Sequence, residues 1–276
     1  MFSRRSMITA VAATALGLFA ALPAVAQTAL ETVTQRGTLR VGMAAADPWF
    51  YKDPISNEWS GVGVQMGKAM AEDLNVEFVP VETTWANSVA AIQAGQIDLM
   101  FVLDPTDERK QAIDFPDQPL FYYAMGALVQ DGMTVADWQD LNVDGTTVGV
   151  TLGTTVDRLL TESLPNAKIE RFASNDEAVA AFASKRVDAV SQFHPALIVQ
   201  VSRIGTGSVV LPKPIHAVPT SVGLAKAADP SFKNWVNDFI AESYASGKTT
   251  EIFETYIATK NIDPASVPGL VKEEWN

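Results

Sequence analysis

The stretch from Gln93 to Tyr123 places the strongest constraint on how this chain folds. Gly95 is typical of a helix end, and the apolar run Ile97–Phe101 predicts a strand covered on both faces. Thr106 is suited to cap the helical turn that follows, because Asp107 and Glu108 then lie in its positive first turn. A helix, a buried strand and a second helix in this order predict an α/β fold.

Short β-branched runs alternate with helical patterns along most of the chain, which predicts βαβ units and mostly parallel sheets. Two lobes are expected, because the residues after position 26 exceed the usual size of one core. In the first lobe we expect strands at Thr38–Met43, Val76–Pro80 and Ile97–Phe101, and helices at Val64–Leu74 and Asn87–Ala94. In the second we expect strands at Ala124–Gln130, Thr147–Thr151, Ile169–Phe172 and Val187–Val190, and helices at Val135–Leu141, Thr155–Glu162, Asp176–Ser184 and Pro195–Val201. A strand at Ser221–Ala225 and helices from Ser231 onward are expected to return to the first lobe.

Residues 1–26 have the pattern of a signal peptide. Arg4 and Arg5 precede the apolar stretch Met7–Leu22, and Ala24-Val25-Ala26 is typical of a cleavage site. Cleavage after Ala26 predicts a periplasmic protein, exported by either the general or the twin-arginine route.

The composition excludes several classes of partner and site. The chain has no cysteine, which excludes disulfides and thiol metal sites. Its net charge is −12, or −14 once Arg4 and Arg5 are removed, and so acidic a chain argues against nucleic-acid or anionic-lipid partners. His194 and His216 are the only histidines and fit no metal-ligand spacing, so we expect no metal and no cofactor.

Arg109 follows the buried strand at the position where open α/β sheets bind small ligands. An arginine there can hold a carboxylate through two parallel N–H bonds. The alternative is a solvated surface charge.

Five blocks of sequence resemble family 3 of the periplasmic solute-binding proteins, the receptors of polar amino-acid ABC importers. The most specific block comprises Thr106–Lys110, Ile113–Pro116 and the pair Tyr122-Tyr123. The other four, in family order, are Gly37–Gly42, Ala90–Asp98, Val148–Thr155 and Arg186–Val190.

The resemblance implies a two-lobed type II periplasmic-binding-protein fold, in which each lobe is a mostly parallel sheet flanked by helices. It implies a first lobe of residues 27–122 and 222–276 and a second of 123–221, with hinge segments at Phe121–Met125 and Val218–Gly223. The implied function is that of a monomeric receptor, which traps a small polar solute between its lobes and delivers it to an inner-membrane permease with its ATPase.

The same resemblance implies which residues hold the ligand. Arg109 and the turn Gly153-Thr154-Thr155 of the other lobe would hold one carboxylate, and this turn can also be read as an ordinary helix cap. Trp85 falls where the family has an aromatic residue that stacks on the ligand, the alternative being a core tryptophan. Trp49 is a weaker candidate for the same wall.

Four positions depart from the family pattern. Ala44 and Phe193 replace the acidic residues that usually hold the ligand's α-ammonium, which predicts a preference for ligands other than ordinary L-α-amino acids. Asp104 would either receive a ligand amine or neutralise Arg109, and Asp47 is a further candidate in the first loop. His194, next to Phe193, would either contact ligand or be structural.

Two other functions remain open at this level. The first is an enzyme that uses Asp104, Asp47 or His194 for acid–base chemistry, because periplasmic cyclohexadienyl dehydratases resemble these receptors. A sensory binding protein is the second. We expect no enzyme, because no catalytic motif is present.

Overall fold

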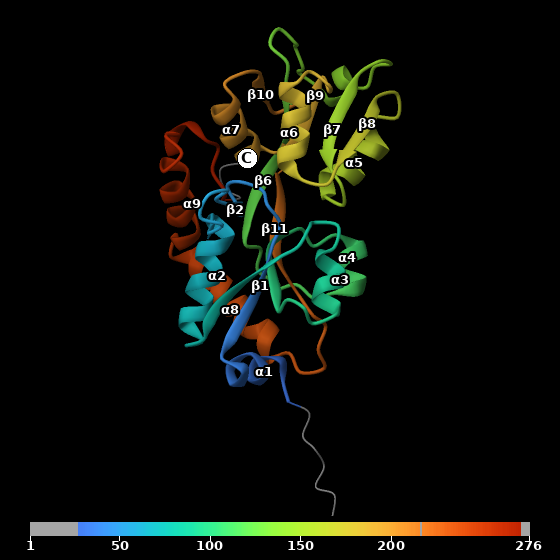
Figure 1. Cartoon of the computed structure of the whole chain (residues 1–276). Coiled ribbons are helices and arrows are strands. Elements are labelled where there is room, and N and C mark those ends of the chain that lie inside the picture. The colour runs from blue at the N-terminus through green and yellow to red at the C-terminus, as the bar shows by residue number, and fades with distance from the viewer. Residues whose placement is uncertain (1–26, 216, 272–276) are drawn as a thin grey trace, which may run out of the picture.

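The computed structural model describes residues 27–215 and 217–271. The predicted signal peptide and His216 lie outside these residues. Two α/β lobes lie one above the other, and the strands β6 and β11 run between them (Figure 1).

The first lobe contains the sheet β4-β1-β5-β11. β4 and β5 are both parallel to β1, whereas β11 is antiparallel to β5. The elements of this lobe are α1 (Ala29–Arg36), β1 (Thr38–Met43), β2 (Tyr51–Lys52), β3 (Trp59–Ser60), α2 (Val62–Asp73), β4 (Glu77–Glu82), α3 (Ser88–Gln93), β5 (Leu99–Leu103), α4 (Asp107–Ala112), β11 (Ala217–Leu224), α8 (Ser231–Ala245), α9 (Lys248–Ala258) and η2 (Pro264–Ser266).

The second lobe contains the sheet β6-β9-β7-β8, with β10 paired to β6. β7 is parallel to both of its neighbours, and β6 is antiparallel to β9. The elements are β6 (Phe121–Val129), η1 (Trp138–Leu141), β7 (Thr147–Thr151), α5 (Thr155–Ser163), β8 (Lys168–Phe172), α6 (Asn175–Ala183), β9 (Ala189–Phe193), α7 (His194–Ile204) and β10 (Ser208–Val210).

β6 and β11 pair with each other before each joins its own sheet. Phe121–Ala124 lie opposite Thr220–Ala217, after which β6 pairs with β9 from Met125 and β11 pairs with β5 from Ser221. Both strands therefore begin earlier than the sequence predicts. The antiparallel pair forms the connection between the lobes.

The helix predicted at Val135–Leu141 is wrong, because only a 3-10 turn forms at Trp138–Leu141. The Asp140 carboxylate accepts the backbone N–H groups of Ala136 and Asp137 at 2.8 and 2.9 Å. The Asp137 carboxylate accepts the N–H of Gln139. Asp137 and Asp140 thus form a capping box, which fixes the start of the helical turn at Trp138.

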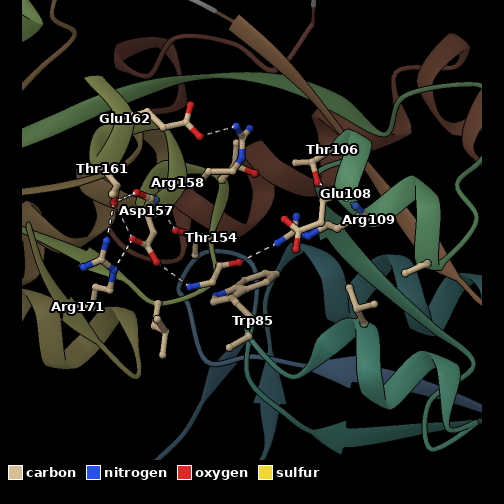
Figure 2. Close-up of a pocket in the computed structure, with 16 residues that line it drawn as sticks. Trp85, Thr106, Glu108, Arg109, Thr154, Asp157, Arg158, Thr161, Glu162 and Arg171 are labelled. Carbon is tan, nitrogen blue, oxygen red and sulfur yellow. Dashed lines mark hydrogen bonds and ion pairs between the residues drawn. The ribbon is translucent and has the colours of Figure 1, made fainter. Parts of the chain in front are cut away.

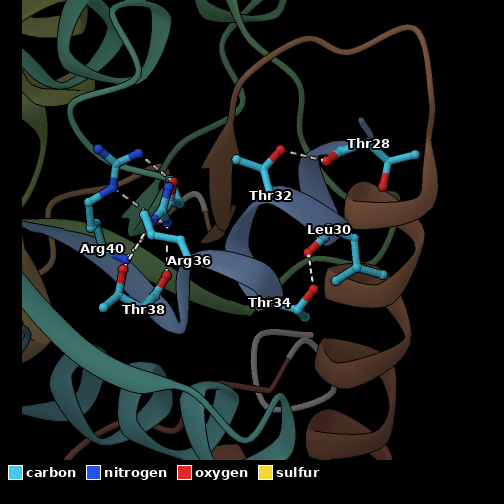
Figure 3. Close-up of polar contacts among 8 residues, drawn as sticks. Thr28, Leu30, Thr32, Thr34, Arg36, Thr38 and Arg40 are labelled. Carbon is cyan, nitrogen blue, oxygen red and sulfur yellow. Dashed lines mark hydrogen bonds and ion pairs between the residues drawn. The ribbon is translucent and has the colours of Figure 1, made fainter. Parts of the chain in front are cut away.

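α1 was not predicted, and its start is well defined. The hydroxyl of Thr28 accepts the N–H of Glu31 while the Glu31 carboxylate accepts the N–H of Thr28, which is a reciprocal cap. Further along the helix, the hydroxyls of Thr32 and Thr34 donate to the backbone carbonyls of Thr28 and Leu30 (Figure 3). The guanidinium of Arg36 donates to the hydroxyl of Thr38 at 2.8 Å. This helix leads directly into β1.

Candidate functional site

Arg109 connects the two lobes. It lies in α4, where the hydroxyl of Thr106 accepts its backbone N–H. Its guanidinium donates to the carbonyl of Asp104 at 3.1 Å and, across the lobe boundary, to the carbonyl of Gly153 at 3.0 Å. Within the described residues no carboxylate forms an ion pair with Arg109, so its charge is available to an anionic group of a ligand.

The carboxylate of Asp104 is buried, with 7% of the residue exposed. It accepts the hydroxyl of Tyr123 at 2.5 Å and that of Thr155 from the second lobe. Burial, and next the charge of Asp104, raises the pKa of Tyr123 well above its usual value, which keeps this phenol a donor. In the part of the chain that the structure describes, no cationic side chain pairs with Asp104. Arg109 contacts its backbone instead.

The turn at Gly153-Thr154-Thr155 begins α5, and the hydroxyls of both threonines already have partners within the protein. The hydroxyl of Thr154 caps the helix by accepting the N–H of Asp157 at 3.2 Å. The Asp157 carboxylate accepts the N–H of Gly153 at 3.1 Å and pairs with Arg171. The hydroxyl of Thr155 donates to the carboxylate of Asp104. A ligand carboxylate would therefore have to compete with Asp104 for the hydroxyl of Thr155.

A small pocket of about 30 Å³ lies between the lobes at this point. Aromatic rings restrict it, since Tyr123 and Phe193 have ring centroids 3.7 Å apart and Trp49 lies 6.0 Å from Tyr123. It is lined by Trp49, Trp85, Val102, Asp104, Arg109, Tyr123, Thr154, Thr155, Asn175, Gln192 and Phe193. We call it the inner pocket. Its volume is close to that of one water molecule.

A larger groove of about 610 Å³ opens beside the inner pocket (Figure 2). α4 with Arg109 forms one side, α5 with Arg158 and Asp157 forms the other, and Trp85 lies between them. We call this the outer groove. Trp85, Arg109, Thr154 and Thr155 line both spaces.

The structure gathers seven of the nine predicted site residues around the inner pocket and places the other two elsewhere. Asp47 is buried against the C-terminal part of the first lobe, where it accepts the hydroxyl of Tyr256 at 2.8 Å and pairs with Lys260 at 2.8 Å. Its neighbour Trp49 stacks on Phe121 with ring centroids 5.1 Å apart. Asp47 therefore anchors the loop that carries Trp49 and does not line the pocket.

His194 is buried at the start of α7 and lies outside the pocket lining. Its Nδ1 accepts the N–H of Ala124 at 3.2 Å, and its Nε2 lies 3.0 Å from the carbonyl of Pro268. These contacts join α7 to a connecting strand and to the C-terminal segment. This geometry supports a structural role for His194 over contact with ligand.

The pH dependence of stability should report this buried histidine. Burial lowers the pKa of His194 to about 4, below the ordinary value of about 6.5 for an unfolded chain. The neutral imidazole is favoured in the fold, so its contribution is complete above about pH 6.5 and is lost as the pH falls towards 4. We expect the free energy of unfolding to fall in that window by up to about 1.4 kcal/mol per pH unit. Urea denaturation of wild type and His194→Gln from pH 7 to 4.5 measures this, and equal slopes would contradict it.

Four residues that line the inner pocket were not among the predicted site residues: Val102, Tyr123, Asn175 and Gln192. Gln192 donates to the hydroxyl of Thr151 at 2.8 Å, and that hydroxyl bonds Asn175 at 3.0 Å, forming a buried polar group at the back of the second lobe. A glutamine within the apolar strand β9 was the available signal. Tyr123 was noted only as part of a motif.

Val102 is the fourth, and its backbone is strained. Its φ of 59° is unusual for a β-branched residue, and the pairing of β5 with β11 shifts register beside it, between Ser221 and Val222. Strained residues of this kind gather at ligand sites, where the surrounding structure holds them.

Trp85 should report ligand binding, since it is half-buried and lines both the inner pocket and the outer groove. We expect ligand to shift the tryptophan fluorescence of wild type and of Trp138→Leu, a control at a tryptophan outside both spaces. Trp85→Leu should lose much of the shift while keeping its far-ultraviolet circular dichroism. An unfolded Trp85→Leu variant would instead indicate a core role.

The described residues contain no group of three or more His, Asp or Glu side chains that could hold a metal ion. No helix within 27–215 and 217–271 is long and apolar enough to cross a membrane.

Two lobes joined by a pair of strands, with a pocket lined by both, define a solute-binding protein of the type II periplasmic-binding-protein fold. The chain belongs to family 3 of the bacterial extracellular solute-binding proteins, whose profile matches residues 39–259. This confirms the resemblance found in the sequence.

Individual relatives agree with the family assignment. The L-arginine-binding protein of Pseudomonas aeruginosa is 30% identical over 180 residues, which cover 63% of this chain and 68% of that protein. The L-cystine-binding protein TcyJ of Escherichia coli is 26% identical over 230 residues, covering 82% and 85%. Among solved structures, the ancestral amino acid-binding protein AncCDT-1, a precursor of cyclohexadienyl dehydratase, has a TM-score of 0.76 and 31% identity and covers 83% of this chain and 99% of that one.

Proposed function

We propose that this protein is the periplasmic substrate-binding component of an ABC importer and holds a small carboxylated solute between its lobes. The observation that carries the proposal is Arg109, a cation without a carboxylate partner among the described residues, whose bonds span the lobe boundary beside a shared pocket. A ligand carboxylate at this guanidinium would contact both lobes and favour the closed form. The names of the relatives, which include L-arginine and L-cystine, support an amino acid or a related compound.

Asp104 provides the second polar contact in this proposal. Its buried carboxylate has two hydroxyl donors and no cationic partner among the described residues, so a ligand amine could supply the missing charge. Trp85, which lines both the inner pocket and the outer groove, would cover the apolar part of the solute.

Ordinary L-α-amino acids are not expected to be the best ligands. Phe193 lines the pocket and Ala44 is buried, and neither can pair with an α-ammonium. Calorimetric titration of the twenty amino acids against wild type and Phe193→Asp measures this preference. We expect weak binding that Phe193→Asp strengthens by about tenfold or more, with the melting temperature of each variant as the control. Micromolar binding of any of them by wild type would contradict the prediction and point to Asp104 as the ammonium partner.

The same proposal includes export and partners. A signal peptide cleaved after Ala26 would deliver the protein to the periplasm, where the monomer would present its closed form to a permease and its ATPase. We assign residues 27–122 and 222–276 to one lobe and 123–221 to the other. The exchange of pairing partners by β6 at Met125 and by β11 at Ser221 supports this division.

An enzyme on this scaffold is the second candidate function. It is favoured by the similarity to AncCDT-1, which its description calls a precursor of cyclohexadienyl dehydratase, and by the buried acid Asp104 close to Arg109. A ligand screen followed by a turnover assay separates the receptor from the enzyme.

A thermal-shift screen with amino acids, opines, amines and small carboxylates tests the proposal, because a ligand that binds the folded state raises the melting temperature by mass action. Each compound that stabilises the protein is then incubated with it and analysed for products. Stabilisation without turnover is expected. Turnover of a stabilising compound would establish the enzyme, and no stabilisation by any member would contradict the receptor.

A further inference from the structure

We infer that the outer groove is a second subsite and that the ligand is an amino acid whose amine is acylated or peptidyl, with its N-substituent in this groove. The inference rests on the proposed function and specifies its ligand class. Four observations lead to it.

The first observation is the size of the two spaces. The inner pocket has about 30 Å³, enough for a small group, whereas the outer groove has about 610 Å³, within the range of small-molecule sites. A ligand anchored here would have most of its volume in the groove.

The second observation is that the two spaces are continuous. Arg109 and Trp85 line both, as does the turn at Thr154-Thr155. A ligand whose carboxylate is held at Arg109 can therefore extend into either space without a second entrance. The shared tryptophan would cover the junction.

The third observation concerns the ammonium. Phe193 lies 8% exposed at the inner pocket and packs edge-on against Tyr123, and the one acid there, Asp104, is bonded to Tyr123 and Thr155. A free α-ammonium could reach Asp104 only inside the inner pocket, whose volume of about 30 Å³ is close to that of one water molecule. An amide nitrogen carries no charge and needs no such partner, so substitution removes the cost of burying the ammonium.

The fourth observation is the lining of the groove, which suits a polar extension. Leu152 contributes an apolar surface that is 45% exposed, and Arg158 is 45% exposed in a long 3.5 Å pair with Glu162. Exposed pairs at this spacing contribute little, so Arg158 and Glu162 can each turn to a ligand group. An amide and a second polar end can be satisfied here.

The experiment compares L-alanine, N-acetyl-L-alanine and L-alanyl-L-alanine, which share one small side chain and one carboxylate. Calorimetric titration is carried out on wild type, on Leu152→Trp to fill the groove, and on Val143→Trp. Val143 is also exposed but lines neither space, so it is the matched control.

We expect wild type and Val143→Trp to bind at least one of the two substituted compounds at least tenfold more tightly than L-alanine. Leu152→Trp should remove that advantage, so that the substituted compounds bind it no more tightly than L-alanine does. Equal or tighter binding of L-alanine by wild type, an advantage that survives Leu152→Trp, or no binding of any of the three compounds would overturn the inference. The proposed function would survive each of these results, because it fails if the wider screen finds no stabilising solute or finds one that is turned over.

Discussion

Arg109→Ala should weaken binding of a carboxylated solute by at least ~30-fold. A guanidinium that grips a carboxylate through two charge-assisted bonds in a closed cleft contributes roughly 2–5 kcal/mol, and each 1.4 kcal/mol is a tenfold change in affinity. Arg109→Lys keeps the charge but loses the planar fork, so an intermediate loss is expected. Calorimetric titration with the strongest compound from the screen measures both variants.

Arg203→Ala is the matched control for this series. Arg203 pairs with Asp176 at 2.6 Å, is 45% exposed and lines neither the inner pocket nor the outer groove. It changes the net charge by the same amount, so a general electrostatic effect would appear in both variants. Equal affinities in Arg109→Ala, Arg203→Ala and wild type would show that Arg109 only bridges the lobes.

Gly153→Ala should weaken binding roughly 5- to 100-fold by holding the lobes apart. A Cβ at Gly153 would lie 2.7 Å from the Cα of Ala86 in the other lobe, a backbone contact that cannot move aside as a flexible side chain does. Overpacking of this kind costs about 1–3 kcal/mol, which here opposes closure. Gly153 also has φ +77°, where an alanine is strained by about 1–2 kcal/mol.

Gly145→Ala separates the steric contact with Ala86 from the backbone strain of an alanine at positive φ. Gly145 lies in the same lobe with φ +88°, and a Cβ there would meet nothing within 4 Å. Both variants should lose similar thermal stability, but only Gly153→Ala should lose ligand affinity in calorimetric titration. If the two variants bound ligand equally well, closure at Gly153 and Ala86 would not be required for binding.

Local patterns in the sequence were sufficient to predict that the strands β1, β5, β7 and β9 exist, but not where each one begins. β1 and β7 have the predicted bounds. β5 and β9, which are buried along their whole length, each begin two residues later than predicted, because an apolar run does not mark its own ends. α1 was missed although Thr28 and Glu31 form a recognisable capping box. The helix at Val135–Leu141 was wrong because Asp137 and Asp140 form a capping box that starts the helical turn only at Trp138.

Predicting the site required information that a local pattern does not contain. Asp47 is held by Tyr256, 209 residues later, so a position near the first strand gave no indication of its partner. The left-handed backbone of Val102 depends on the register of β5 against β11, and sequence does not give register between strands so far apart. Arg109 was found because it follows a strand at the edge where open α/β sheets bind ligands. Asp104 and Trp85 were found through the family resemblance.

One carboxylated solute should be bound, unchanged, between the lobes. Equilibrium dialysis of the strongest compound from the screen against wild type and Arg109→Ala, followed by mass spectrometry of both compartments, measures this. We expect about one molecule bound per wild-type chain, recovered with its original mass, and little bound to Arg109→Ala at the same concentration. Equal binding by Arg109→Ala, or a product of different mass in the wild-type compartment, would contradict it.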